Sequence, residues 1–207
     1  LLMNGFGGHR IEGIGDKHVP WVHNVRNTDA IAAIDDEDCM RVLRLFNEAP
    51  GRKYMETAGI SDSDVAMLPL LGISSIGNLL ASIKTAKYFE LNEQDVVFTI
   101  FTDSVELYGS RLKELEHERG KYSAIDAAKD HTAFLLHQGI DHYKELTYYE
   151  RKAIHNLKYF TWVEQQGKTV EELDVQWNPE YWQKLLEDEV VEFDTLINEF
   201  NDTVGRA

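Results

Sequence analysis

The chain has 207 residues, of which 43% are hydrophobic, 11% aromatic and 28% charged, as in an ordinary folded protein. Asp and Glu outnumber Lys and Arg by 36 to 21, and the formal net charge is −15. Such a surface repels phosphate backbones and anionic lipids, so we expect no nucleic-acid partner and no membrane partner. The single cysteine, Cys39, cannot form an internal disulfide, and no apolar run approaches the ~20 residues that span a bilayer. We therefore expect a cytoplasmic protein with a structural thiol.

The first 115 residues alternate short apolar runs with helical patterns. Strands are predicted at residues 30–34, 68–73 and 96–101, and the last run is almost entirely β-branched or aromatic. A helix is predicted after each strand. This alternation predicts an α/β domain over residues 1–115, with a mostly parallel sheet and flanking helices.

Local signals mark where these helices start and stop. Asp35 is expected to cap a helix that runs to about Glu48, where Pro50-Gly51 ends it. Ser74 and Ser75 can cap the next helix through their side-chain oxygens.

Residues 116–207 are predicted to form an all-helical extension with no convincing strand. Capping boxes are expected at Thr147/Glu150 and Thr169/Glu172, and Asn178-Pro179 is expected to start the last helix. The dense aromatic residues of this extension are interpreted as helix packing, or as a face that covers a neighbouring domain or subunit.

Three glycine or serine turns are candidate ligand contacts. The Gly13-Ile14-Gly15 turn allows close backbone approach to a ligand, although a simple tight turn explains it too. Hydroxyl groups also lie at two predicted strand ends, in the turn at residues 72–75 and at Ser104. Each is followed by a predicted helix, and α/β proteins bind ligands at such strand ends. Helix capping is the alternative role for both. No GxSxG elbow surrounds Ser104, so a hydrolase nucleophile is not predicted.

The eight histidines do not have metal-ligand spacing, and we expect no metal site. His18 and His23 are five residues apart across Pro20, and His131 and His137 are six apart on a predicted helix, so neither pair shares a face.

Taken in order, the three turns resemble motifs of the cysteine synthase and cystathionine β-synthase family, which are fold-type II pyridoxal-phosphate enzymes. Residues 9–15 with Val19-Pro20 are similar to the segment before the family's active-site glycine turn, residues 72–75 to its GISSG turn, and residues 96–104 to its VVILPDS strand and turn. The resemblance covers roughly residues 9–112, and residues 155–177 are similar to the longer bacterial members.

The resemblance implies pyridoxal 5'-phosphate as cofactor and β-elimination or β-replacement on a serine- or cysteine-type amino acid. It implies that Ser104 hydrogen-bonds the pyridine nitrogen, that Gly13 flanks the cofactor and that Ser74 lies close to the ring. Gly15, Asp16 and Lys17 are then expected near the substrate. A homodimer or higher oligomer is expected as well.

The chain departs from the family pattern in three ways. Asp16-Lys17-His18 replaces the small or aromatic residues that usually follow the glycine turn, and Ile76 stands where GISSG has its last glycine. The family's Schiff-base lysine and phosphate loop lie upstream of these motifs, and neither Lys17 nor Lys84 occupies the lysine's position. We therefore expect the catalytic lysine in a missing N-terminal half or a companion chain.

Two other hypotheses stay open at this point. One is a non-catalytic α/β-plus-helical module that binds a partner or regulates a synthase. The other is a small-molecule binding domain that uses the same strand-end crevice.

Overall fold

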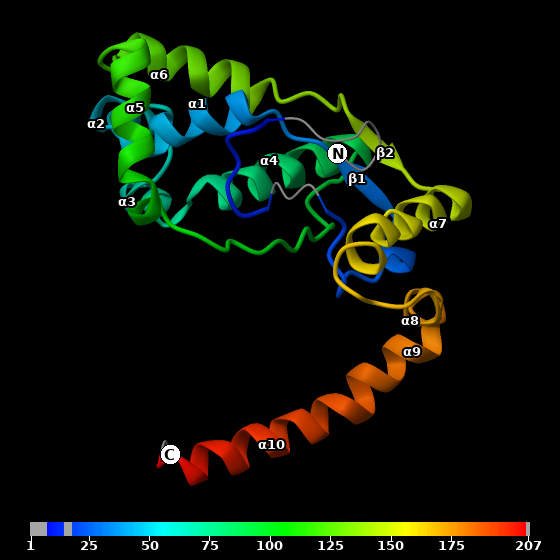
Figure 1. Ribbon diagram of the computed structural model, residues 1–207. Coiled ribbons are helices and arrows are strands. Elements are labelled where there is room, and N and C mark those ends of the chain that lie inside the picture. Colours follow the sequence, from blue (N-terminus) through cyan, green and yellow to red (C-terminus); the bar gives the residue numbers. More distant parts are fainter. Residues whose placement is uncertain (1–7, 15–17, 206–207) are drawn as a thin grey trace. The chain divides into compact units, whose positions relative to one another are not determined.

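The computed structural model describes residues 8–14 and 18–205. Within these ranges the chain forms two compact units (Figure 1). The large unit contains residues 8–14 and 30–145, and the small unit contains residues 18–29 and 146–205.

The large unit is predominantly helical. Its helices are α1 (Asp36–Asn47), α2 (Ala49–Thr57), α3 (Asp62–Met67), α4 (Ile73–Tyr88), α5 (Gly109–Arg119) and α6 (Ala124–Asp130), with 3₁₀ turns at Leu68–Leu70 and Val105–Tyr108 and a π-helix at His131–Leu136. Its sheet has two antiparallel strands, β1 (Ala30–Ala32) and β2 (Tyr143–Glu145), with Ile31 opposite Lys144. The expected α/β fold with a mostly parallel sheet is therefore wrong, and so is the expectation that no strand follows residue 116.

Two of the three predicted strands have no partner strand in the described chain. Pro69 lies in the 3₁₀ turn Leu68–Leu70, where its fixed φ and missing N–H suit a turn better than a central strand. Residues 96–101 form no regular structure, and no backbone–backbone hydrogen bond joins them to another described residue. A strand needs a neighbour for its ladder of hydrogen bonds, so strand-forming side chains alone do not order this run.

The core of the large unit lies between α1 and α4 and is completed by residues of α2, α5 and α6 (Figure 1). α1 starts as predicted, because the Asp35 side chain accepts a hydrogen bond from the Glu37 backbone N–H at 2.8 Å. Pro50 and Gly51 do not end it. They lie in the first turn of α2, where the missing proline N–H leaves no hydrogen bond unmade. The fully buried residues on α1 and α4 are Cys39, Met40, Val42, Leu43, Leu45, Ile73, Ser75, Ile76 and Leu80.

Cys39 has the environment of a structural thiol. It is a free, fully buried cysteine, and its burial together with nearby carboxylates raises its pKa to about 12.

The small unit is built from α7 (Tyr148–Asn156), α8 (Val170–Val175), α9 (Pro179–Lys184) and α10 (Val190–Thr203), with a 3₁₀ turn at Val25–Asn27 and π-helices at Tyr159–Val163 and Leu185–Glu189. Both predicted capping boxes are confirmed, at Thr147/Glu150 and at Thr169/Glu172. Asn178 caps α9 as predicted by accepting from the Glu180 backbone N–H. These starts depend on residues three or fewer positions apart, which is why local sequence predicts them.

A buried lysine lies at the centre of the small unit. The Lys158 ammonium donates to the backbone oxygens of Trp21 (2.8 Å) and His23 (2.7 Å) and to Gln176 Oε1 (2.8 Å). The Lys158 side chain is fully buried, and burial lowers its pKa to about 8. The rings of Trp21 and Trp182 each lie 5.8 Å from the nitrogen. All four tryptophans of the chain belong to this unit.

No single helix of the described chain is long and apolar enough to cross a lipid bilayer. The neighbouring helical stretches at residues 62–70 and 73–88 reach that length only together, and they are bent by 120°.

Candidate functional site

The three turns singled out in the sequence meet at the N-terminus of α4. A Cβ added to Gly13 would lie 2.9 Å from the Ser74 hydroxyl, so the glycine turn lies directly against this helix. Asp103, the residue before Ser104, binds the backbone of Ser74 and Ser75. We call this arrangement the three-turn corner and define it by Gly13, residues 72–75, Asp103, Ser104 and Tyr108. All of it lies in the large unit.

Asp103 caps α4 from outside the helix. Its Oδ2 accepts from the Ser74 backbone N–H at 2.9 Å, and its Oδ1 accepts from the Ser75 backbone N–H at 2.8 Å and the Ser75 hydroxyl at 2.6 Å. Tyr108 donates its phenol proton to Oδ2 at 2.7 Å. The helix N-cap residue is Gly72, so the expectation that Ser74 and Ser75 cap α4 through their own side chains is wrong. A carboxylate at this end also complements the helix dipole.

The same contacts set the charge of Asp103. Burial by itself would raise the pKa of the Asp103 carboxyl, but hydrogen bonds from two hydroxyls and two backbone N–H groups outweigh it and bring the pKa below its usual value. Burial and the hydrogen bond to this carboxylate raise the pKa of Tyr108 to about 12. Asp103 therefore stays ionised with its oxygens occupied. It is a structural anchor and is poorly placed to act as a general base.

Glycine is required at two positions of the three-turn corner. Gly13 has a φ of +119°, which L-residues with side chains rarely adopt. A Cβ on Gly72 would lie 2.6 Å from Asp103 Cγ and 2.8 Å from Tyr108 Cε2, so any larger residue would push the capping carboxylate away.

Ile76 departs from the GISSG pattern, and the structure shows its role. Its side chain is fully buried in the core. The next residue, Gly77, faces the glycine turn, and a Cβ added there would make an ordinary contact with Ile14 Cδ1 at 3.4 Å. Ile14 of the glycine turn thus packs onto α4 beside the corner.

Ion pairs made by Arg10 and Glu12 hold the glycine turn in place. Arg10 donates its backbone N–H (2.7 Å) and its guanidinium (3.0 Å) to Asp36 at the start of α1. Arg111 of α5 donates to Glu12 Oε1 at 2.6 Å. Gly13 is therefore tied to two helices of the large unit through the residues that precede it.

The next residue of α1, Glu37, joins this network. It accepts from the guanidinium groups of Arg10 (2.8 Å), Arg41 (2.7 Å) and Arg119 (2.7 Å to each carboxylate oxygen). Burial alone would raise the pKa of Glu37, but these hydrogen bonds lower it to about 2. The carboxylate is ionised at all ordinary pH values.

The Ser104 hydroxyl is not used to cap a helix. Ser104 occupies the N-cap position of the 3₁₀ turn Val105–Tyr108, but its side chain makes no capping hydrogen bond. It is half-buried at the edge of the three-turn corner. Of the two roles that the sequence left open for this residue, capping is therefore excluded.

The remaining sequence candidates lie elsewhere or outside the described residues. Gly15, Asp16 and Lys17, expected near the substrate, fall outside the described residues. Lys84 lies on α4 with its side chain buried, and its ammonium donates to the Asp141 backbone oxygen at 2.7 Å, with the Asp141 carboxylate at 3.5 Å. That anchoring leaves Lys84 no role at the three-turn corner.

Sequence reasoning missed the two residues that organise the corner. The family-like motif at residues 96–104 contains Asp103 but gives it no role, and Tyr108 lies outside all three motifs. An acidic residue two positions after a strand-like run is the signal that could have pointed to Asp103. No local pattern indicates Tyr108, because its partner is reached through the fold.

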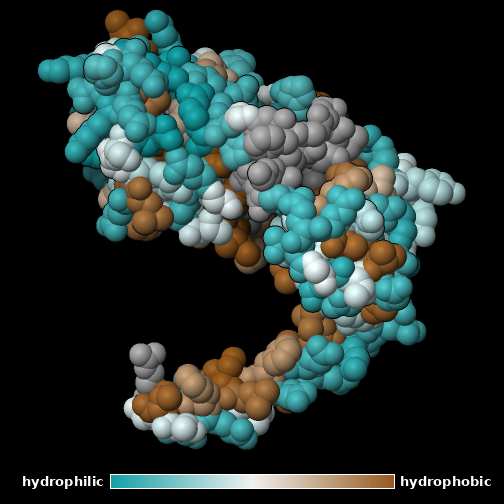
Figure 2. Space-filling model, in the orientation of Figure 1, coloured by the Kyte–Doolittle hydropathy of each residue, from teal (hydrophilic) through white to brown (hydrophobic). Residues whose placement is uncertain are grey.

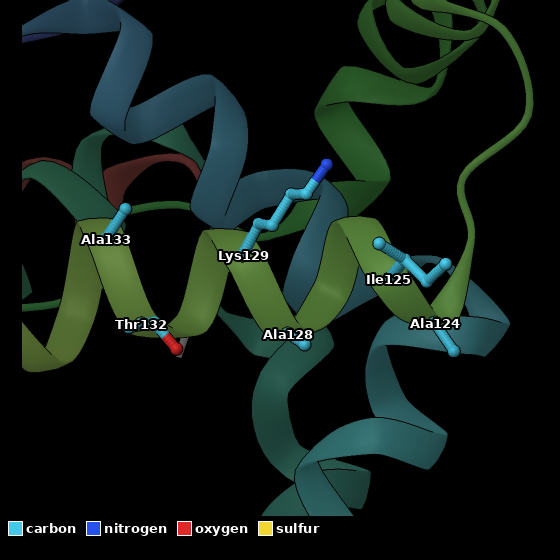
Figure 3. A pocket seen from close by; sticks show the side chains of 6 residues that line it. All are labelled: Ala124, Ile125, Ala128, Lys129, Thr132 and Ala133. Atoms are coloured by element: carbon cyan, nitrogen blue, oxygen red, sulfur yellow. The ribbon is translucent and has the colours of Figure 1, made fainter.

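A shallow depression of about 620 Å³ lies on a different part of the large unit. Its lining residues come from one helical stretch, α6 and the following π-helix: Ala124, Ile125, Ala128, Lys129, Thr132 and Ala133 (Figure 3). Lys129 is the one charged side chain among them. With no second element facing it, this depression lacks the converging polar groups of a ligand site.

Among the residues that the structure describes, no group of three or more His, Cys, Asp or Glu side chains is placed to hold a metal ion. No protein-family model, curated protein or solved structure matches the chain.

Proposed function

We propose that the three-turn corner is one side of a pyridoxal-phosphate site in an enzyme of β-elimination or β-replacement on a serine- or cysteine-type amino acid. Two contacts carry the proposal: Gly13 lies against Ser74, and Asp103, the residue before Ser104, binds the backbone of Ser74. Gly13, Ser74 and Ser104 are far apart in the sequence and belong to three motifs of one family resemblance. When bound, pyridoxal phosphate supplies an electron sink for chemistry at the amino acid's β-carbon.

The corner suits the pyridine-ring side of the cofactor. The Ser104 hydroxyl makes no capping hydrogen bond. It can therefore donate to an unprotonated ring nitrogen. Gly13 and Gly72 bring two backbone segments together where a Cβ would collide with a neighbour. Ser74 is 2% exposed and lies against Gly13, so in this proposal it supports the turn beside the ring.

The corner does not suit the phosphate or the catalytic lysine. The backbone N–H groups of Ser74 and Ser75 at the start of α4 already bind Asp103, so these two donors are not free for a phosphate. Lys84 is engaged with Asp141. In this proposal a preceding polypeptide segment or a companion chain supplies both the lysine and the phosphate loop.

An exposed apolar run next to the corner supports a missing structural neighbour. Val96 and Phe98 are 90% and 87% exposed. Residues 96–101 make no backbone–backbone hydrogen bond to another described residue, although the Ile100 carbonyl accepts from the Asn78 side chain at 2.8 Å. Apolar side chains in such a run are a liability unless another chain segment covers them. The same observation favours the second candidate function, a non-catalytic module that binds a partner or regulates a synthase.

Within the proposal, Ser104 is the cofactor-binding residue, and Asp103 with Tyr108 are positioning residues that fix the start of α4. We propose a cytoplasmic enzyme that assembles as a homodimer or higher oligomer. The amino-acid substrate then binds on the Gly13 side of the ring.

Borohydride reduction of the protein purified from its own cells, followed by denaturing mass analysis of every polypeptide present, tests the proposal. We expect a reduced pyridoxyl adduct on a lysine of a larger or companion polypeptide. No adduct on any polypeptide would refute the enzyme proposal and leave the binding module.

A second experiment tests the role of Ser104 directly. Ser104→Asp places a carboxylate where the ring nitrogen is proposed to lie, so the absorption spectrum of the bound cofactor should shift and β-elimination should fall. Ser110→Asp makes the same change at an exposed position of α5 and serves as control. Identical spectra and rates in the wild type and both variants would remove Ser104 from the site.

A further inference from the structure

The helix α10 carries an apolar stripe that no other described residue of the small unit covers. Its members are Val190, Phe193, Leu196, Ile197, Phe200 and, at the C-cap, Val204. Their side chains are 47% to 65% exposed, and α10 has no buried residue. Figure 2 shows the brown side chains gathered along one side of this helix and the teal ones along the other.

The spacing of these residues is that of a helix–helix contact. Val190, Phe193, Ile197, Phe200 and Val204 follow one another at alternating steps of three and four residues, which is the pattern of a coiled-coil seam. With Leu196 they form a stripe about 120° wide. A stripe of this width normally packs against another element. Single apolar side chains scattered over a surface are normal, whereas a continuous stripe of them indicates an interaction site.

The charges on either side of the stripe are all negative. At about 100° per residue, Asp194 lies beside one edge, and Glu192 and Glu199 lie beside the other. Between Lys184 and Arg206 the sequence has seven carboxylates and no lysine or arginine. Pairing this helix with a second copy of itself would place carboxylates against carboxylates along both edges, which disfavours such a pair. Anionic lipid is disfavoured for the same reason.

We propose that α10 docks on another protein, on an apolar groove or helix whose edges carry lysine or arginine side chains. The stripe supplies the contact area, and the flanking carboxylates select partners with basic edges over acidic ones. This inference does not depend on the pyridoxal-phosphate proposal, because it uses none of the residues of the three-turn corner.

The test uses two synthetic amphipathic helical peptides and the full chain. Both peptides have leucine at the a and d positions, and they differ in carrying lysine or glutamate at e and g. We expect the lysine peptide to bind at least about tenfold more tightly than the glutamate peptide, with an affinity that falls as salt is added. Equal binding of the two peptides, or binding of neither, would overturn the proposal.

Two variant pairs locate the contact on the helix. Asp194→Lys at the stripe edge should weaken binding of the lysine peptide by about fivefold, and Asp202→Lys, the same change on the opposite face, should alter it by less than about twofold. Ile197→Asp in the stripe should abolish binding, and Val191→Asp outside it should not. Far-UV circular dichroism reports whether a variant has lost its helix, and the charge pair leaves the apolar stripe intact in any case.

Two further measurements test whether the stripe binds a second copy of the chain or a lipid surface instead. Sedimentation that shows a dimer disrupted by Ile197→Asp would assign the stripe to a second copy of the chain. Flotation of the chain with phosphatidylcholine vesicles would assign it to a lipid surface. Either result would refute docking on a basic-edged protein.

Discussion

Replacing Lys158 by Met tests how a buried charge contributes to the small unit. In the wild type three oxygens accept hydrogen bonds from the ammonium, and methionine fills a similar volume without donating to any of them. Each buried acceptor left unpaired costs about 1–3 kcal/mol. The variant also removes a charge that the protein interior disfavours, so the two effects oppose each other.

The pKa of Lys158 determines, at each pH, whether the lost hydrogen bonds or the removed charge has the larger effect on stability. Lowering the pKa of Lys158 from 10.5 to about 8 means that holding the proton in the folded state costs about 3 kcal/mol at neutral pH. Because the unfolded chain binds this proton more tightly, wild-type stability rises as the pH increases from about 8 to the ordinary lysine pKa. A neutral amine still donates two of the hydrogen bonds. We therefore expect Lys158→Met to lower the free energy of unfolding by about 3 kcal/mol near pH 10. Near pH 7 we expect it to change that free energy by less than about 1 kcal/mol.

Urea unfolding followed by tryptophan fluorescence measures this difference, because all four tryptophans belong to the small unit. Lys184→Met, at a largely exposed lysine of α9, is the matched control and should change the stability little at either pH. A large loss of stability that is the same near pH 7 and pH 10 would refute the reasoning. It would mean that the three hydrogen bonds hold the Lys158 pKa at its ordinary value.

Three further predictions concern the large unit and can be followed by far-UV circular dichroism. Asp103→Asn should destabilise it by about 2–3 kcal/mol at neutral pH. In the wild type that contribution should disappear as the pH falls through the lowered Asp103 pKa, and a variant as stable as the wild type would rule out the cap. Gly13→Ala should lower stability by about 1–2 kcal/mol through its positive φ and its contact with Ser74, whereas Gly109→Ala, with open space and an ordinary φ, should not. Glu37→Gln should cost about 2 kcal/mol after allowance for solvent screening, and the wild type should lose this stability between about pH 4.5 and pH 2. Acid unfolding curves of wild type and variant that coincide in that range would contradict it.

Four helix starts could be predicted from the sequence because their caps depend on neighbours in the chain. The Asp35 cap, the two capping boxes and the Asn178 cap each join residues two or three positions apart, and all four are present. The sheet could not be predicted in this way. Residues 96–101 have stronger strand propensity than β2, yet β2 is the segment that finds a partner, at β1, more than a hundred residues earlier.

The sequence points to three residues of the corner and not to the two that organise it. Gly13, Ser74 and Ser104 were identified by motif, and the fold places the first two in contact. The α4 cap could not be foreseen from propensity, because its oxygen atoms come from Asp103, 28 residues after Ser75. Tyr108 was missed because its phenol is informative only once that carboxylate is in place.

The cap donated by Asp103 makes two distant segments open and close together. The first turn of α4 cannot fray without releasing the loop around residue 103, and the loop cannot leave without exposing the amides of Ser74 and Ser75. These amides should therefore exchange with solvent deuterium as slowly as the loop detaches. If Ser104 holds a ligand as proposed, these amides should exchange more slowly still, and their exchange would then report whether the ligand is bound.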